Sequence, residues 1–200
     1  PAESVGAVFP AGTVPDIYRP TLYDVLAFEQ IALCESAAAA GPAVPSFELA
    51  ADGPAFESAT TFTRLIPAEP APSPILKALQ LFKAILQFHD KDKDRSAFAA
   101  ADLERLAFCF RHAKGNDVRT RYIGALDHFM SEWRRSVISV RAADIRAELT
   151  AEDGDPGIAH LMAERGMAGF PADDIGVRQC KAIIQRLERP ALSVRVERVW

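Results

Sequence analysis

The sequence predicts a mainly α-helical fold with an extended N-terminal arm and an extended C-terminal tail. Apolar residues recur at intervals of three and four through most of the chain, which is the spacing of one helix face. Prolines are concentrated in residues 1–74, where they interrupt regular structure. In residues 192–200 apolar and polar side chains alternate instead, as they do in a strand. We therefore expect helices in the centre and extended segments at both ends.

The composition is that of an ordinary globular chain. Its 200 residues are 49% hydrophobic and 25% charged, which is enough apolar material to bury a core. The formal net charge of -4, with acidic and basic residues interspersed, provides no field that would attract nucleic acid. No stretch approaches the ~20 apolar residues of a membrane-spanning helix. We expect neither nucleic acid as a partner nor a membrane span.

The number and spacing of the cysteines indicate the redox state of the protein's cellular compartment. Cys34, Cys109 and Cys180 are widely spaced and odd in number, which argues against a disulfide framework and predicts an intracellular, reducing compartment. The chain begins at Pro1 rather than methionine, so we expect that an initiator residue or a longer targeting segment has been removed. A mitochondrial or other organellar location fits the second alternative, and both alternatives stay open.

Residues 1–74 are predicted to form a proline-rich arm with one or two helices. Prolines favour an extended chain over residues 1–20. Thr21 and Asp24 then form a variant of the capping box, which predicts a helix that ends before the Gly-Pro pair at 41–42. A second helix is expected over residues 55–66.

The first of these helices carries a mostly apolar stripe. Its members recur at helical spacing and share one face. They are Leu22, Val25, Leu26, Glu29 and Leu33.

Residues 75–149 are predicted to form the helical core. Ser73 and Pro74 supply an N-cap and a first-turn proline for an amphipathic helix that ends at His89. Alanine-rich and aromatic stripes at the same spacing predict more helices downstream. These cover residues 99–113, about 117–133, and 140–149.

Residues 150–200 are predicted to form C-terminal helices and an extended tail. An acidic turn at 152–157 precedes a short helix over 158–165 and a longer one over 171–187. The alternating tail at 192–200 either packs on its own domain or adds as a strand to the sheet edge of a partner. Both interpretations of the tail stay open.

A row of alternating aspartates follows the helix that ends at His89. Asp90, Asp92 and Asp94 come first, and Asp102 lies further on. This order resembles the calcium loop of the EF-hand family, in which alternating oxygen ligands hold the ion. Arg95 replaces the glycine of that family, and the intervening basic residues cancel charge. The resemblance therefore implies weak calcium binding by the four aspartates or none, and the alternative is a solvated helix connection.

The sequence predicts a second helix-loop-helix about forty residues later. With it, residues 75–149 resemble a degenerate, calmodulin-like pair of EF-hands. The resemblance implies that Phe98 and Ile138 meet through short strand contacts between the two loops. The second loop offers Ser131, Trp133 and Arg135 at the ligand positions, so it would not bind metal.

Other candidate chemistry is sparse. Cys109 and His112 lie three apart on one expected helix and His128 lies on the next, a set that could hold a soft metal between helices. No fourth ligand has suitable spacing, which favours a buried cysteine instead. The sequence contains no GxSxG, no HExxH and no glycine-rich phosphate loop. We expect no catalytic residues, no small-molecule substrate, and no cofactor unless calcium binds.

These observations predict a non-enzymatic structural or interaction subunit of a larger multiprotein complex. Such an accessory subunit would bind other protein subunits through its extended arms. The alternative is a calcium-responsive EF-hand module that binds a target helix in an apolar groove. The absence of catalytic motifs and the extended segments favour the first function.

Overall fold

The computed structural model describes residues 16–40, 47–67, 73–172 and 174–189. Within these ranges the chain forms eight α-helices and no strand, so the predicted mainly α fold is confirmed. None of these helices is long and apolar enough to cross a membrane. Of the extended arm predicted over residues 1–20, the structure describes only residues 16–20, and there Asp16–Tyr18 form a turn of 3-10 helix instead of extended chain. The rest of that arm and the tail predicted at 192–200 lie outside the described residues.

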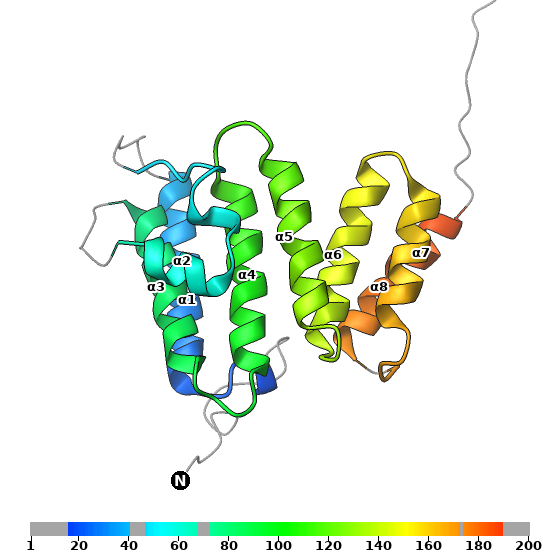
Figure 1. The fold of residues 1–200 in the computed structure, drawn as a ribbon, viewed down its shortest axis with the longest axis horizontal. Coiled ribbons are helices and arrows are strands. Elements are labelled where there is room, and N and C mark those ends of the chain that lie inside the picture. The colour runs from blue at the N-terminus through cyan, green and yellow to red at the C-terminus, as the bar shows by residue number, and fades with distance from the viewer. Residues whose placement is uncertain (1–15, 41–46, 68–72, 173, 190–200) are drawn as a thin grey trace, which may run out of the picture. The chain divides into compact units, whose positions relative to one another are not determined.

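The chain divides into two compact units, residues 1–133 and residues 134–200. Their boundary falls inside the segment 75–149 that resembles an EF-hand pair. Helices of both units are labelled in Figure 1. The first unit contains α1 (Leu22–Ala40), α2 (Ala59–Leu65), α3 (Pro74–His89), α4 (Ser96–His112) and α5 (Val118–Glu132). The second contains α6 (Ile138–Glu152), α7 (Pro156–Met167) and α8 (Ile175–Glu188).

Helix α1 begins with the predicted capping box. The backbone N–H of Thr21 donates to Oδ2 of Asp24 at 2.9 Å, and the Thr21 hydroxyl donates to the same oxygen at 2.7 Å. In return the backbone N–H of Asp24 donates to the Thr21 hydroxyl at 3.3 Å. These bonds satisfy free N–H groups of the first turn and leave Asp24 buried.

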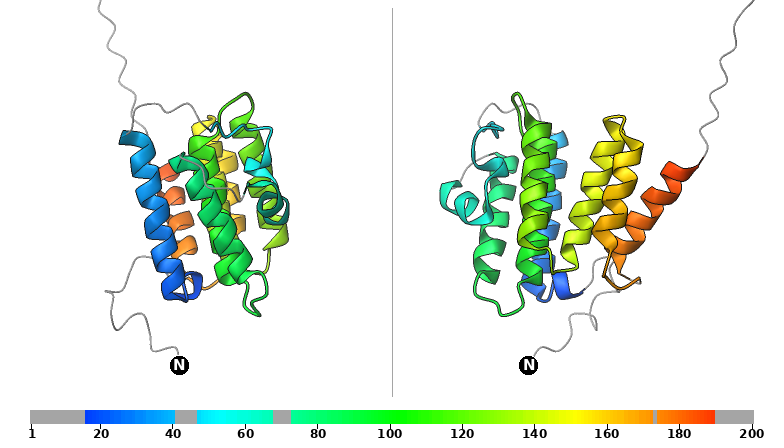
Figure 2. Two further views of the ribbon diagram at one scale, coloured as in Figure 1. Left: turned by 90° about the vertical axis from the view of Figure 1, so that its left-hand side faces the viewer. Right: turned by 45° about the vertical axis from the view of Figure 1, so that its right-hand side comes forward.

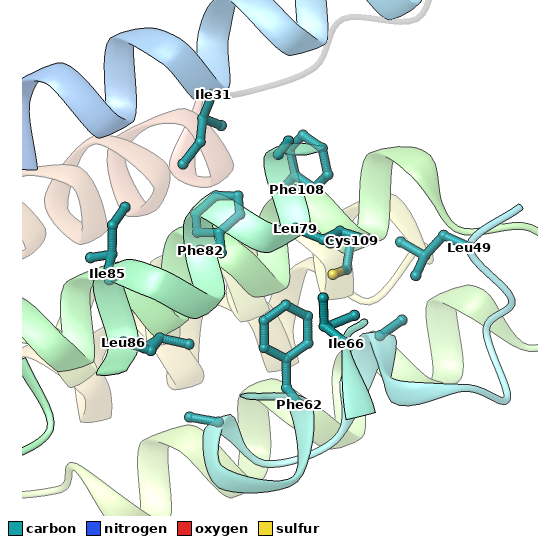
Figure 3. Packing of buried hydrophobic residues seen from close by; sticks show 14 of the residues in the cluster. Ile31, Leu49, Phe62, Ile66, Leu79, Phe82, Ile85, Leu86, Phe108 and Cys109 are labelled. Atoms are coloured by element: carbon teal, nitrogen blue, oxygen red, sulfur yellow. The ribbon is translucent and has the colours of Figure 1, made fainter. Parts of the chain in front are cut away.

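The core of the first unit lies between α1, α2, α3 and α4, as Figure 3 shows. Helix α3 is capped by Ser73 as predicted and buries most of its apolar stripe. Phe82 of α3 lies 5.4 Å from Phe108 of α4, measured between ring centroids. Ile31 of α1 and Phe62 of α2 belong to the same buried cluster. Helices α1 and α3 run side by side (Figure 2).

Helix α4 begins three residues earlier than predicted. Oδ1 of Asp94 accepts the backbone N–H of Ser96 at 2.9 Å, so the helix starts directly after the aspartate loop. Phe98 therefore lies inside α4, and Ile138 is the first residue of α6. The expected strand contact between Phe98 and Ile138 is wrong, because both residues have helical backbone. Among the described residues, the isolated β-bridge joins Ala50 to Lys114.

In the second unit each of the three helices packs against the other two. Its core contains Val140 and Ala147 from α6, Ala159 from α7, and Cys180 from α8. Gly166 lies so close to α6 that a Cβ added there would overlap the Cβ of Ala143. Small residues thus let α6 and α7 approach each other closely.

Helix α8 begins four residues later than the sequence predicts. Oδ1 of Asp174 accepts the backbone N–H groups of Gly176 and Val177, and this cap sets the start at Ile175. A capping aspartate satisfies N–H groups that would otherwise lack a partner, so the helix starts where the cap is.

Candidate functional site

The aspartates of the loop after α3 contact the protein itself. Oδ2 of Asp92 lies 2.6 Å from Nδ1 of His89, and Oδ1 of Asp90 lies 3.8 Å from Nη2 of Arg95. Hydrogen bonds from the hydroxyl and the backbone N–H of Ser96 lower the pKa of Asp94. These carboxylates stabilise the turn and the start of α4.

Asp102, the fourth proposed ligand, is buried on α4. Its Oδ1 accepts from Nε of Arg105 at 2.8 Å and lies 2.7 Å from Nη2. Arg105 also donates to the backbone carbonyls of Ala55 at 2.8 Å and Glu57 at 3.0 Å. Its guanidinium lies over the ring of Phe62, 4.5 Å from the centroid. The Asp102 carboxylate therefore holds an arginine that ties α4 to the segment before α2.

The structure does not bring the four aspartates together as a ligand set. In the described part of the chain, no group of three or more His, Cys, Asp or Glu residues is arranged to hold a metal ion. EF-hand loops direct their carboxylates at one point, whereas here Asp92 and Asp102 have basic partners of their own. Calcium binding stays a prediction, and none of these contacts supports it.

His89 is the centre of a buried polar cluster, which we call the His89 cluster and which consists of Asp24, His89 and Asp92. Nε2 of His89 lies 2.6 Å from Oδ1 of Asp24, and Nδ1 lies 2.6 Å from Oδ2 of Asp92. His89 and Asp24 are 1% exposed, while Asp92 is 44% exposed. The cluster joins the start of α1 to the end of α3 and to the loop that follows.

Two short contacts to carboxylates favour the charged form of His89. A neutral imidazole has one N–H, whereas an imidazolium donates from both nitrogens. Burial acts to lower the pKa of His89, but the hydrogen bonds and charges of Asp24 and Asp92 outweigh burial and raise the pKa above 6.5. No local pattern in the sequence indicates a partner for this histidine on another helix. The one signal was that His89 continues the apolar stripe of α3.

The cysteine and histidine residues considered for a soft metal do not converge. Cys109 is buried, and burial raises the pKa of its thiol to about 11. Nε2 of His112 lies 2.8 Å from Oε1 of Glu35, and His128 lies 3.9 Å from Glu132 on its own helix. A thiol with a raised pKa is a poor metal ligand, because metals bind the thiolate. The structure therefore favours the buried-cysteine interpretation.

A cleft of about 430 Å³ opens in the first unit between α4, α5 and the segment before α2. Asp102 and Arg105 lie along it and bind each other. Arg121, His128 and Glu132 line it from α5. Its charged groups are of both signs, and His128 and Glu132 are exposed to water. These features provide no buried acid-base pair of the kind that catalysis uses.

A polar cluster of the second unit is centred on Asp144. Burial raises the pKa of Asp144 to about 6, with a further contribution from the charge of Glu148. Arg186 and Arg141 act in the opposite direction, and Arg186 forms an ion pair with Glu148. Asp144, Glu148 and Arg186 line a hollow of about 250 Å³. The charges on both sides of Asp144 therefore act on its carboxyl group in opposite directions, and burial has the largest effect.

The most distinctive surface lies on the outer side of α1. The stripe singled out in the sequence is largely exposed, because α1 buries the narrower set Ala27, Ile31 and Cys34 instead. We call this surface the α1 face. It consists of Leu22, Tyr23, Leu26 and Leu33 together with Phe88 of α3, and these side chains are 39% to 63% exposed. The rings of Tyr23 and Phe88 lie 4.8 Å apart, which joins the two helices in one surface.

Comparison with known proteins gives no assignment: no family model, no curated protein and no solved structure matches this chain.

Proposed function

We propose that this chain is a non-enzymatic structural or interaction subunit of a larger protein assembly, and that it binds another protein through the α1 face. The observation that carries the proposal is the row of large apolar side chains that α1 leaves in water. Side chains of this kind present roughly 150–250 Å² each when fully exposed, so five of them at about half exposure leave on the order of 500 Å². Patches of this size often mark interaction sites.

The polar clusters support the same function. The His89 cluster and the Asp102–Arg105 pair use their hydrogen-bonding groups on one another and on the backbone. Such groups hold elements of the fold in place, and a structural subunit needs a fold that is held in this way. An enzyme of comparable size would direct at least one acid, base or nucleophile toward a substrate.

For the fold, we propose in addition that residues 75–149 are related to a degenerate pair of EF-hands. Helix α3, the aspartate loop and α4 form one helix-loop-helix, which supports the resemblance for this half of the pair. In this proposal the loop is a scaffold, because Asp92 and Asp94 stabilise the protein's own turn. The proposal that the N-terminal arm and the tail at 192–200 bind neighbouring subunits rests on the sequence alone.

The proposed function is tested by cross-linking in the cells that produce the protein. The complexes of the full-length chain are compared with those of Leu26→Glu, which places a charge in the centre of the α1 face. The matched control is Leu161→Glu, since Leu161 is similarly exposed but belongs to α7. We expect Leu26→Glu to lose the cross-linked complexes and Leu161→Glu to keep them. A wild-type chain recovered only as a monomer would contradict the proposal.

A further inference from the structure

We infer that the α1 face binds the α1 face of a second copy of this chain, with the two helices antiparallel across a two-fold axis. This inference rests on the proposed function and names the partner at the same surface. Three observations carry it: the distribution of side-chain sizes along α1, the apolar area, and the scarcity of charge.

Side-chain size changes along the outer side of α1. The exposed residues of its first half are large, and they include Leu22, Tyr23 and Leu26. Apart from Leu33, which lies near the middle of the helix, the exposed residues of its second half are small or polar, and they include Ser36, Ala37 and Ala40. All of them except Tyr23 recur at helical spacing on one stripe, because their positions differ by three or four or by sums of these. A helix that carries this stripe is wide at one end and narrow at the other.

In an antiparallel pair, the wide end of α1 in one copy lies against the narrow end of α1 in the other copy. A two-fold interface brings the same patch of both copies together, so residue i faces residue j and j faces i. With Glu29 of one copy opposite Leu33 of the other, Leu22 lies opposite Ala40, and Leu26 lies opposite Ser36. Large side chains then fill the space that small ones leave, at both ends of the pair. Parallel pairing would instead place leucine on leucine at one end and leave a gap between alanines at the other.

The apolar area matches what a specific dimer needs. Two copies of the α1 face would together remove on the order of 1,000 Å² from water, before the alanines are counted, and this is about the lower limit for a specific interface. Because the area is near this lower limit, we expect a weak dimer, with a Kd on the order of 1–100 μM.

Few charged side chains lie on the exposed stripe of α1 to oppose this pairing. Glu35 lies beside the stripe, but Arg111 and His112 bind its carboxylate and lower its pKa. Glu29 is the exposed charged residue within the stripe. In the antiparallel register the two Glu29 side chains are offset by about 6 Å along the helix axis, close enough to repel each other. Glu29→Gln should therefore strengthen the dimer.

Sedimentation velocity on the purified full-length chain tests the inference. We expect the wild type to change from monomer to dimer between about 1 and 100 μM. Leu26→Glu and Leu33→Glu should weaken the dimer at least about tenfold, while Leu161→Glu should leave it unchanged. Helical circular dichroism must match the wild type, so that loss of the dimer is not loss of the fold. A dimer that persists in both variants would overturn the inference.

Cysteine cross-linking tests the orientation. The native thiols are buried, so added ones react first. A mixture of Leu22→Cys and Ala40→Cys chains should form the mixed disulfide, whereas Leu22→Cys alone should form little. Efficient cross-linking of Leu22→Cys to itself would show parallel pairing and overturn the inferred arrangement.

The inference can fail while the proposed function stands. A wild-type chain that stays monomeric at 100 μM overturns the second copy as partner. If Leu26→Glu nevertheless loses its cross-linked complexes in cells, the α1 face binds a different protein. If both experiments show only monomers, both proposals fail.

Discussion

Nε2 of His89 and Oδ1 of Asp24 lie 2.6 Å apart, although 65 positions separate the two residues in the sequence. The same aspartate caps α1 through Thr21. One carboxylate therefore closes the start of α1 and also binds the last residue of α3. Because both residues are buried, water cannot replace either partner.

Removing the Asp24 carboxylate should destabilise the first unit. Asp24→Ala deletes a helix cap and leaves a buried imidazole without its partner, so we expect a loss of about 2–4 kcal/mol in the free energy of unfolding. Urea denaturation measures this loss. The control is Asp92→Ala, which removes the half-exposed partner of the same ring and should cost about 1 kcal/mol or less. Equal losses in the two variants would contradict the role given to Asp24.

The raised pKa of His89 predicts a dependence of stability on pH. The folded pKa lies above the unfolded value near 6.5, so the stabilisation is fully present below pH 6.5. It is lost as the pH rises through the folded pKa. Urea denaturation between pH 6 and pH 9 should show this decline in the wild type and a smaller one in His89→Gln. Parallel pH profiles of the two proteins would show that His89 does not titrate in this way.

Asp144 should destabilise the second unit at neutral pH. Its pKa rises from 3.8 to about 6 on folding, so the folded chain binds the proton more tightly and loses stability as the pH rises through this range. Asp144→Asn avoids the cost of a partly buried charge and should stabilise the protein by about 1 kcal/mol at pH 7, after allowance for solvent screening. Thermal unfolding at pH 7 and at pH 4 checks this. The gain should disappear at pH 4, and a gain of the same size at both pH values would assign it to another cause.

The close approach of α6 and α7 predicts that Gly166 tolerates no larger side chain. Gly166→Ala should cost about 1–3 kcal/mol, because the added Cβ overlaps that of Ala143. Adding Ala143→Gly to this variant should restore part of the loss. Gly157→Ala is the matched control on α7, since an added Cβ there meets nothing within 4 Å. Equal effects of Gly157→Ala and Gly166→Ala on urea denaturation would show that the two helices are not in close contact.

Calcium should not bind the aspartate loop at physiological concentrations. Asp92 would have to leave His89, and Asp102 would have to leave Arg105, before either could coordinate an ion. Calorimetric titration of the full-length chain should show no binding heat up to about 1 mM calcium. Binding that is abolished by the Asp90→Ala/Asp92→Ala double substitution would instead support the calcium-responsive module.

Local signals in the sequence were sufficient for most helices and for two of their caps. Thr21 with Asp24, and Ser73 with Pro74, predicted the starts of α1 and α3 because capping acts within one helical turn. The starts of α4 and α8 differ from the predicted boundaries because Asp94 and Asp174 accept backbone N–H groups at the beginning of these helices, which the apolar pattern does not indicate.

Contacts between distant residues could not be predicted in this way. The partner of His89 comes from another helix, and no local pattern indicates it. The buried side of α1 was also missed, because Ala27, Ile31 and Cys34 together present less apolar surface than the three leucines opposite them. Apolar residues on both sides of a helix show that both sides avoid water, but not which side faces the chain's own core.

The contacts of Arg105 have a consequence for the order of folding. Its guanidinium joins α4 to carbonyls that precede it by about fifty positions, at Ala55 and Glu57. Closing so long a loop costs conformational entropy. The hydrogen bonds of Arg105 compensate for this cost only after α4 has formed and holds the arginine in place. The short segment around Ala55 should therefore dock late in folding and open early in unfolding. Its amide protons should exchange with solvent sooner than those of α4, although both are buried in the same native unit.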